Sequence, residues 1–326
     1  MRYIADMSAN INVSMSYQNF NRTAYGSGCA VRREGSEERG TAADTVQMNA
    51  EIGEFGSSIK VRVVSYNVEN LFDAIDDPHK KDEDTLPKSA EDMAKLARAL
   101  ALAGGDVVTL QEVENIDILN EFLDKYLPDQ YPYRALVEGN DIRGIDVAVI
   151  SKYPIDNVQS HKNVRFPMPD GKKTFLRRDL LRTDINIKGI PFTVYTTHLK
   201  AHAGGRRADE VRLGEAKAVR GIIAEEMREY PGRRYVLTGD FNDTPNSAVG
   251  RVFLGGDNGL WKSSLSELAE KESITHPPTH RAIDYVLYPE AMLSEAKGGG
   301  VQRLADGEMG SDHWLIYGDF QFKTPA

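Results

Sequence analysis

Carboxylate, amide and imidazole side chains recur at the ends of the apolar runs of this sequence. They follow VRVVSY, VVTL, FTVYTT and YVLTG, and one pair precedes WLIYGDF. In a layered α/β fold, strand ends gather residues from distant parts of the chain into one crevice. Asp, Glu, Asn and His also hold hard divalent cations and handle protons on phosphate esters. The residues concerned are Asn67, Glu69, Glu112, His198, Asp240, Asn242, Asp312 and His313.

Each of these residues also has an ordinary structural explanation. A glutamate after a strand, such as Glu112, commonly caps a helix or pairs with a surface cation. The GDFND stretch is rich in turn formers, and Asp284 in IDYVL has the pattern of an exposed residue on a half-buried strand. The joint occurrence of these residues favours the chemical explanation.

The elements that position these residues can be predicted from the hydrophobic pattern. Strand-like and helical segments alternate without an internal repeat, which favours a single layered α/β domain. A hairpin expected over residues 175–199, turning at KGIP, speaks against the purely parallel sheet that alternation alone would allow. We expect further strands over residues 59–67, 106–115, 144–151, 233–243, 282–288 and 312–322, and helices over residues 88–105, 116–127 and 206–230.

Residues 1–58 differ from the rest of the chain. They are polar, with scattered Asn, Ser and Gly and the charged stretch RREGSEERG, and show no sustained helical or strand period. We expect a disordered leader over residues 1–58, followed by one folded domain over residues 59–322.

The composition limits the size of the core, the mode of nucleic-acid binding and the residue types that could hold a metal. The chain has 326 residues, of which 40% are hydrophobic, enough for one large core or two modest ones. Its net charge of −9 disfavours unspecific binding along nucleic acid unless basic groups cluster locally. Cys29 is the single cysteine, which excludes an intramolecular disulfide and a thiolate-rich zinc site, so oxygen or imidazole would hold a metal.

No run approaches the roughly 18 apolar residues that span a bilayer, which predicts no membrane insertion. The first residues also lack a basic segment followed by an apolar block, the pattern of a secretory signal. A cytoplasmic location is the default expectation, and a secreted or periplasmic one stays open if the true start lies elsewhere. No sequence feature points to an obligate protein partner.

The motifs together resemble the endonuclease/exonuclease/phosphatase superfamily, the fold of deoxyribonuclease I and of AP endonucleases of the exonuclease III type. The stretches that carry this resemblance stand in the family's order: SYNVENLF, LQEVEN, RGIDVAVISKYPI, TTHLKAH, LTGDFNDTPNS, IDYVL and GSDHWL. GDFN together with SDH is the most specific part, and NVENLFD and LQEVEN are most similar to a bacterial branch whose substrates vary.

The resemblance implies the fold and the extent of the catalytic domain. It implies a four-layered α/β sandwich, in which two mixed β-sheets pack face to face with helices outside. The site would lie at one edge of the sheets, and residues 59–322 would form the catalytic domain.

The resemblance also implies a site that binds Mg²⁺, with Mn²⁺ as an alternative ion. Glu112 would be the principal ligand with Asn67 beside it, and Asp312 would be a second carboxylate ligand. AP endonucleases have Asp at the position of Glu69, whose longer side chain would still reach the metal.

The remaining polar residues would act on the phosphate. Asp240 would orient and deprotonate the attacking water, and Asn242 would hold this geometry and contact a phosphate oxygen. His313 would stabilise charge on the scissile phosphate, with Asp284 accepting a hydrogen bond from its other ring nitrogen. His198 would contact the phosphate or protonate the leaving oxygen rather than bind a metal.

Arg143 and Lys200 are the expected substrate contacts. Arg143 lies in NDIRGIDVAV, where relatives commonly present a residue that contacts the phosphate. Lys200, with His202, Arg206 and Arg207, would form a local basic rim for substrate phosphates. The alternative is that these residues are the solvated start of a helix.

The implied activity is Mg²⁺-dependent hydrolysis of a phosphodiester, with an endonuclease acting on DNA or RNA as the leading expectation. A phosphatase or phosphodiesterase acting on small or lipid-linked phosphate esters is the alternative. The lack of a counterpart to the phosphate-binding tyrosine of AP endonucleases speaks against abasic-site repair. A catalytically silent binding module on the same fold is disfavoured because the set Glu112, Asp240, Asn242, Asp284 and His313 is complete.

Overall fold

The computed structural model describes residues 58–324, apart from residues 83, 256–260 and 306. The leader predicted over residues 1–58 lies outside the described residues, except for Ser58, which is the first residue of a strand. The described strands begin at Ser58 and end at Lys323, and the domain boundaries at residues 59 and 322 stay a prediction.

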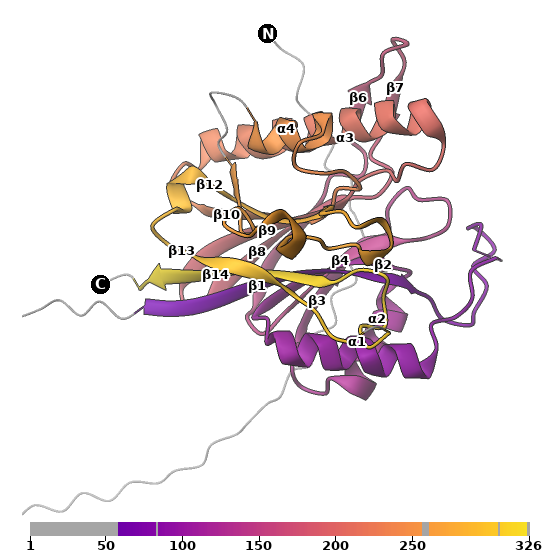
Figure 1. Ribbon diagram of the computed structural model, residues 1–326, viewed down its shortest axis with the longest axis horizontal. Helices are drawn as coiled ribbons and strands as arrows, with labels where there is room; N and C mark the ends of the chain where they lie inside the picture. The colour runs from indigo at the N-terminus through magenta and orange to yellow at the C-terminus, as the bar shows by residue number, and fades with distance from the viewer. Residues whose placement is uncertain (1–57, 83, 256–260, 306, 325–326) are drawn as a thin grey trace, which may run out of the picture.

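Two six-stranded sheets form the centre of the described part of the chain (Figure 1). The first contains β1 (Ser58–Leu71), β2 (Val107–Val113), β3 (Tyr133–Leu136), β4 (Asp146–Ser151), β13 (Ala296–Gln302) and β14 (Leu315–Lys323). The second contains β5 (Ile155–Ser160), β8 (Leu180–Ile187), β9 (Ile190–His198), β10 (Arg234–Asp240), β11 (Trp261–Ser263) and β12 (Asp284–Pro289). A separate hairpin is formed by β6 (Arg165–Pro167) and β7 (Lys173–Phe175).

Both sheets are mixed. The strand orders are β13-β14-β1-β2-β4-β3 and β11-β12-β10-β9-β8-β5. β1 and β2 run parallel, as do β9 and β10, whereas the other neighbouring strands in each sheet are antiparallel. The predicted hairpin is confirmed as β8 and β9, and the purely parallel sheet is excluded.

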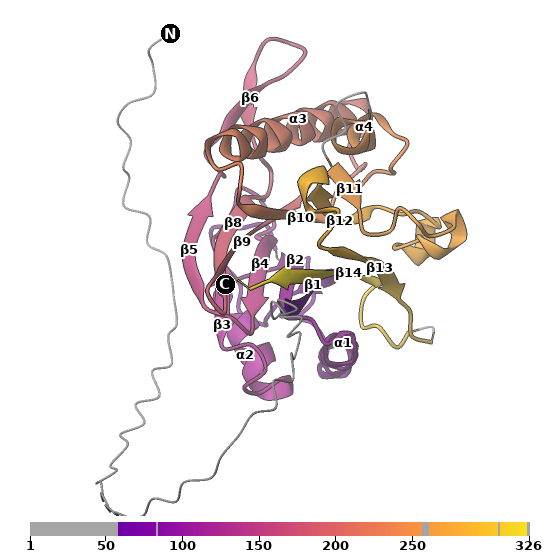
Figure 2. The same cartoon turned by 90° about the vertical axis from the view of Figure 1, so that its left-hand side faces the viewer.

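Helices cover the outer face of each sheet. They are α1 (Ala90–Ala103), α2 (Ile116–Tyr126), α3 (Gly205–Glu229) and α4 (Ala248–Leu254), with short 3-10 turns η1 (Glu270–Glu272), η2 (Pro277–Thr279) and η3 (Glu290–Met292). Figure 2 shows α3 and α4 on one side of the paired sheets and α1 and α2 on the other. The four-layered sandwich is therefore confirmed.

Three apolar layers hold the sandwich together: one between the sheets and one under each pair of helices. The alternation along β1 shows how the sequence produces them. Val61 and Val63 point into the core between the sheets, whereas Val64 and Tyr66 pack toward α1 and α2. Because both faces of β1 are buried from Val63 to Val68, apolar residues there face both layers and do not alternate with exposed polar ones. Each fully buried valine stabilises the fold by about 1.5–3 kcal/mol.

Local signals explain where α1 begins and ends. Ser89 caps the helix by accepting a hydrogen bond from the Asp92 N–H. Gly104 ends it in the left-handed region, with a φ of 64°, and donates its N–H to the Leu100 carbonyl. The helix predicted over residues 88–105 is thus confirmed, with ends set by a serine and a glycine.

The parallel pairs decide where polar strand ends meet. Because β1 runs parallel to β2 and β9 runs parallel to β10, the carboxyl ends within each pair lie at the same edge. The two sheets also contact each other through β1 and β10.

None of the helices in the described part of the chain has the length and apolar character needed to span a membrane.

Candidate active site

Asp240, the last residue of β10, lies at the centre of a buried polar cluster. The strand register places it opposite His198 of β9 and Asp284 of β12. Its Oδ2 accepts a hydrogen bond from Asn67 Nδ2 at 3.1 Å and lies 3.5 Å from His198 Nε2 and 3.8 Å from His313 Nε2. Side chains from both sheets therefore converge on one carboxylate.

Burial determines the charge state of this carboxylate. Burial, and next the charge of Asp284, raise the pKa of Asp240 to about 7, although His313 and two asparagine hydrogen bonds act in the opposite direction. A carboxyl group that ionises near neutral pH is suited to take a proton from water.

The turn after β10 fixes the orientation of Asp240. The Asn242 N–H donates to Asp240 Oδ1 at 2.7 Å, and Asn242 Nδ2 donates to the Leu199 carbonyl at 3.0 Å. Gly239 has a φ of 137°, and a Cβ at this position would lie 1.9 Å from the Thr197 carbonyl oxygen. GDFND thus comprises the last two residues of β10 and the bend that follows them, and this bend orients the carboxylate.

His313 and Asp284 form a second buried pair. His313 Nδ1 lies 2.9 Å from Asp284 Oδ2, which also accepts a hydrogen bond from Thr275 Oγ1 at 2.6 Å. Burial alone would lower the pKa of His313, but the negative charges of Asp284 and Asp240 raise it to about 10. His313 is therefore a cation at neutral pH, with its Nε2 directed toward Asp240.

His198, the last residue of β9, is buried between two carboxylates. Its Nε2 lies 3.5 Å from Asp240 Oδ2 and 3.9 Å from Glu112 Oε1. Burial, and next the charge of Arg178, hold its pKa well below the usual range. A neutral ring fits a hydrogen bond to a phosphate oxygen better than protonation of a leaving group.

Glu112 reaches the cluster because the chain is irregular at this residue. Glu112 has a φ of 66°, and the register between β2 and β4 shifts at this residue. Such a β-bulge changes the direction in which a side chain points. Its Oε2 accepts a hydrogen bond from the Asn70 N–H at 3.1 Å, and its Oε1 lies 3.4 Å from Asn67 Nδ2. Asn67 Oδ1 instead accepts the Glu69 N–H at 3.0 Å. The Asn67 amide would have to turn before its oxygen could reach a cation beside Glu112.

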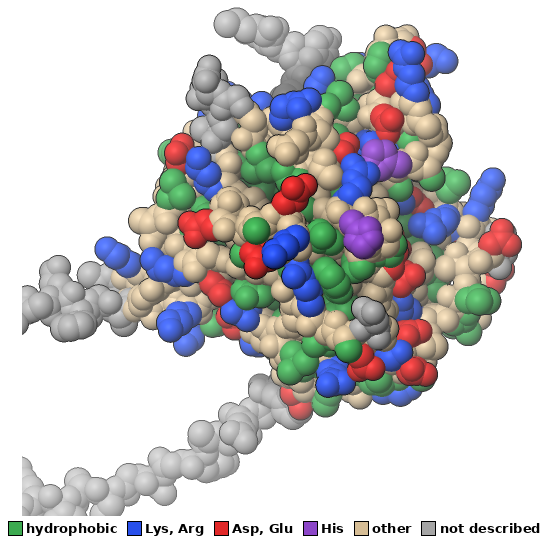
Figure 3. Space-filling view, viewed as in Figure 1, with side chains coloured by type: hydrophobic (Ala, Val, Ile, Leu, Met, Phe, Trp, Pro, Cys, Tyr) green, Lys and Arg blue, Asp and Glu red, His purple; other side chains and the backbone are tan. Residues whose placement is uncertain are grey.

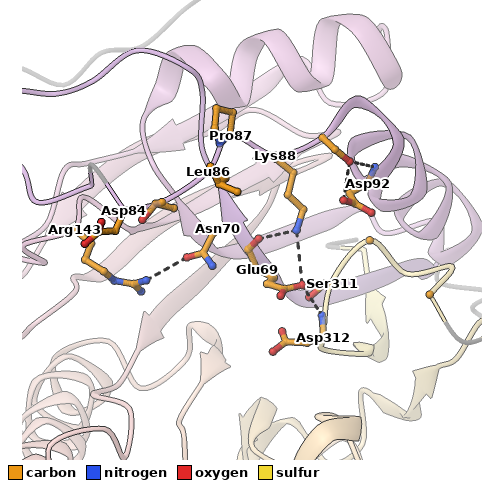
Figure 4. A pocket seen from close by; sticks show the side chains of 14 residues that line it. Glu69, Asn70, Asp84, Leu86, Pro87, Lys88, Asp92, Arg143, Ser311 and Asp312 are labelled. Atoms are coloured by element: carbon orange, nitrogen blue, oxygen red, sulfur yellow. Dashed lines mark hydrogen bonds and ion pairs between the residues drawn. The ribbon is translucent and has the colours of Figure 1, made fainter.

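Two further carboxylates, those of Glu69 and Asp312, lie close to each other at this edge of the sheets. Glu69 Oε2 accepts the Asp312 N–H at 2.9 Å and lies 3.8 Å from Lys88 Nζ (Figure 4). Burial, and next the charge of Asp312, raise the pKa of Glu69. A bound cation would offset the charge of Asp312 that raises the pKa of Glu69, and Glu112, Glu69 and Asp312 offer the oxygen atoms that Mg²⁺ prefers.

A cavity of about 800 Å³ opens next to these carboxylates. Figure 4 shows Arg143 on its wall, with the guanidinium directed toward Asn70, and Nη1 donates to Asn70 Oδ1 at 3.4 Å. Glu69, Lys88 and Asp312 also line it. The sequence prediction that Arg143 contacts substrate phosphate is consistent with this position and stays a prediction.

The predicted basic rim is largely occupied by local contacts. Lys200 Nζ donates to the Ala203 carbonyl at 3.0 Å, and His202 Nδ1 lies 3.1 Å from Asp209 Oδ1. Arg206 pairs with Glu210 at 3.1 Å, and Arg207 pairs with Asp170 at 3.3 Å. These contacts at the beginning of α3 favour the structural explanation for His202, Arg206 and Arg207, and a substrate contact by Lys200 would require its side chain to leave its own loop.

Arg178 is a component of the site that no sequence motif identified. It is buried, its Nε lies 2.8 Å from Asp141 Oδ2, and its charge lowers the pKa of His198. An arginine in a sequence such as FLRRDLL normally faces solvent. Only the tertiary structure shows that this cation is turned inward.

The surface charges are mixed on one face of the molecule. On the face seen in Figure 3, lysine and arginine side chains alternate with aspartate and glutamate, and no continuous basic surface forms. Acidic residues also lie beside the cavity in the loop after β1, where Asp73, Asp76 and Asp82 line a smaller neighbouring pocket.

Comparisons with known proteins identify the family and the fold. Residues 62–258 match the sequence model of the endonuclease/exonuclease/phosphatase family. No curated protein matches the sequence.

Several solved structures share the fold. The human Nocturnin catalytic domain with bound sulfate anion has 16% identity and a TM-score of 0.56, over 82% of this chain and 97% of that one. Truncated TDP2 from Caenorhabditis elegans has 18% identity and a TM-score of 0.56, over 80% and 97%. An endonuclease/exonuclease/phosphatase from Beutenbergia cavernae has 19% identity and a TM-score of 0.59, over 81% and 72%.

Proposed function

Because the chain belongs to the endonuclease/exonuclease/phosphatase family, whose members hydrolyse phosphoester bonds, we propose that it is a metal-dependent phosphodiester hydrolase that acts on nucleic acid. The observation that carries this proposal is the convergence of the His198 and His313 ring nitrogens within 4 Å of the Asp240 carboxylate, next to the carboxylate of Glu112.

Asp240 is the base in this proposal. Its pKa of about 7 lets it accept a proton from water at neutral pH, and the Asn242 N–H at 2.7 Å holds the carboxylate in one orientation. Asn242 also lies where its amide could contact a phosphate oxygen once it leaves the Leu199 carbonyl.

His313 and His198 serve the phosphate in different ways. His313 is cationic, oriented by Asp284, and stabilises negative charge that develops as the phosphorus–oxygen bond breaks. His198 is neutral and donates one hydrogen bond from Nε2 to a phosphate oxygen. Arg143, on the cavity wall, meets the phosphate from the other side.

Glu112, Glu69 and Asp312 would hold the cation, with Asn67 positioning Glu112. When bound, Mg²⁺ or Mn²⁺ polarises a phosphate oxygen and offsets charge on the leaving group. The residues of this chain supply the base, the orienting hydrogen bonds and the exclusion of water around Asp240, which is only 2% exposed.

A second candidate function is hydrolysis of small or lipid-linked phosphate esters. The mixed charge on the face seen in Figure 3 and the acidic loop beside the cavity favour this function. A long polyanion would gain little from such a surface. The 800 Å³ cavity is also large enough for a compact ester.

Hydrolysis assays with the full chain distinguish these functions. Supercoiled plasmid, a small phosphodiester and a phosphomonoester would each be incubated with Mg²⁺, with and without EDTA. Nicking of plasmid that EDTA abolishes is the expected result. Hydrolysis of small esters without nicking would favour the second function, and no hydrolysis of any of the three would contradict the proposal and favour a silent binding module.

A further inference from the structure

His276 lies beside Asp312 and His313 but has no role in the hydrolysis proposed above. Its Nε2 lies 3.3 Å from Asp312 Oδ2, and its ring centre lies 4.6 Å from that of His313. His276 Nε2, an Asp312 oxygen and a His313 ring nitrogen all lie within 4.8 Å of one another. Two imidazoles and one carboxylate thus converge on a single point.

The other ring nitrogen of each histidine already has a partner. His276 Nδ1 lies 2.7 Å from Thr279 Oγ1, and His313 Nδ1 lies 2.9 Å from Asp284 Oδ2. A hydrogen bond at one ring nitrogen fixes the ring and leaves the other free to bind a metal, as in carboxylate–histidine–zinc triads. In both rings, Nε2 is therefore the ligand atom, and zinc would have to displace the proton that cationic His313 carries there.

The backbone holds His276 in place. The His276 N–H donates to the Arg281 carbonyl at 3.0 Å, and the Thr275 carbonyl accepts the Trp314 N–H at 2.6 Å. Two prolines follow His276 in η2 and restrict the loop further. The loop that carries His276 is thus tied to the segment that carries His313.

The donor set and its spacing favour zinc over magnesium. Tetrahedral zinc, with ligands about 2.1 Å from the ion, separates its donors by about 3.4 Å. His276 Nε2 lies 3.3 Å from Asp312 Oδ2 and His313 Nε2 lies 3.8 Å from Asp312 Oδ1, so modest side-chain movement would bring one carboxylate oxygen to this spacing from both rings. Imidazole nitrogen suits Zn²⁺, whereas Mg²⁺ prefers octahedral oxygen. Three protein ligands would leave a fourth position for water or a substrate oxygen.

We propose that His276, Asp312 and His313 form a zinc site, which shares Asp312 with the oxygen site at Glu112, and that zinc bound there inhibits phosphodiester hydrolysis. The inhibition rests on the proposed function, because zinc on His313 Nε2 removes that atom from the phosphate. The zinc site itself does not depend on the proposed function, because it is inferred only from the three side chains and their hydrogen-bond partners.

Zinc binding to the full chain, measured by competition with a chromogenic zinc chelator in excess Mg²⁺, tests the site. His276→Asn should weaken zinc binding at least about ten-fold, and Thr279→Val, which removes only the partner of Nδ1, should weaken it by less. His280→Asn is the matched control. It lies in the same loop, is exposed and has a φ of 54°, which asparagine tolerates. If His276→Asn does not fold, Thr279→Val tests the site instead. Zinc binding by Thr279→Val that is weaker than that of the wild type would support the site, and equal binding would overturn it.

Zinc inhibition of hydrolysis is then measured for the same proteins. Half-inhibition of His276→Asn should require at least about ten-fold more zinc than that of the wild type and His280→Asn. Equal zinc affinity of all four proteins would overturn the site. Zinc binding that depends on His276, in a chain that hydrolyses no phosphoester, would support the site and count against the proposed function. Zinc binding without inhibition of an active chain would overturn the inhibitory role.

Discussion

Asp240 and His313 lie 3.8 Å apart and reach opposite charge states in the same buried cluster. The pKa of Asp240 is raised to about 7, and that of His313 is raised to about 10. Activity needs Asp240 without its proton and His313 with it. The rate should therefore rise as pH increases through about 7 and fall as pH approaches 10, as a profile of kcat/KM from about pH 5 to 10.5 would show.

Replacing Asp284 tests the origin of the alkaline limb of this profile. Asp284→Asn removes the main charge that raises the pKa of His313, so His313 should lose its proton at lower pH. The alkaline limb should move down by about one pH unit or more. An alkaline limb that stays in place would show that His313 is not the group responsible.

His198 tests the role of a neutral imidazole. Its lowered pKa predicts that it acts as a hydrogen-bond donor and not as an acid. His198→Ala should lower kcat by about 10²–10³-fold, and His198→Gln, which retains an N–H donor, should recover part of that loss. If glutamine and alanine give the same activity, a proton-transfer role becomes the better account.

The strand ends were predictable because the apolar runs that precede them have clear limits. Asp240 and His198 lie near the strand ends where the sequence placed them, and the hairpin and the three long helices are also confirmed. Asp284, which was expected inside a strand over residues 282–288, is instead the buried first residue of β12. The irregular backbone was not predictable. The positive φ values of Glu112 and Glu69 depend on strand register, which local sequence does not specify.

Gly239 is the backbone position on which the Asp240 end of β10 depends. Its φ is 137°, and a methyl group has no space here because a Cβ would lie 1.9 Å from the Thr197 carbonyl oxygen. Gly239→Ala should destabilise the fold by about 1–3 kcal/mol and lower activity by displacing Asp240. Gly221→Ala in α3 is the matched control, since nothing lies within 4 Å of its Cβ, and chemical denaturation should show it unchanged or stabilised. Equal stability of the two variants would contradict this explanation.

Asp146, at the start of β4, couples stability to pH. Burial raises its pKa from 3.8 to about 8, so the folded chain binds this proton more tightly than the unfolded chain. Its contribution to stability is complete below about pH 4 and is lost as pH rises through about 8. The free energy of unfolding should fall between about pH 5 and 8, by at most about 1.4 kcal/mol per pH unit, and Asp146→Asn should flatten this slope. Denaturation curves recorded across this pH range give the free energy of unfolding at each pH. If its dependence on pH is the same in Asp146→Asn as in the wild type, other groups cause that dependence.

At the scale of the whole molecule, the family resemblance predicted the layers and their order. Two mixed sheets, helices outside and a polar cluster at one edge follow from motifs spread from SYNVENLF to GSDHWL. The resemblance did not identify Arg178 or His276, because neither lies in a motif and each acquires its surroundings from loops that fold against the site. The pair of Arg206 with Glu210 follows from helical spacing in the sequence, whereas the contact of Arg207 with Asp170 depends on the tertiary structure.

The central claim is that Asp240 activates water for metal-dependent phosphodiester hydrolysis. The most direct measurement is the Mg²⁺-dependent rate of hydrolysis of a small phosphodiester by the wild type and by Asp240→Asn, which keeps the shape of the side chain. Asp156→Asn, at an exposed position of β5, is the control. The account predicts a loss of about 10²-fold or more for Asp240→Asn and a rate equal to the wild type for Asp156→Asn. An Asp240→Asn rate within a few-fold of the wild type would contradict it.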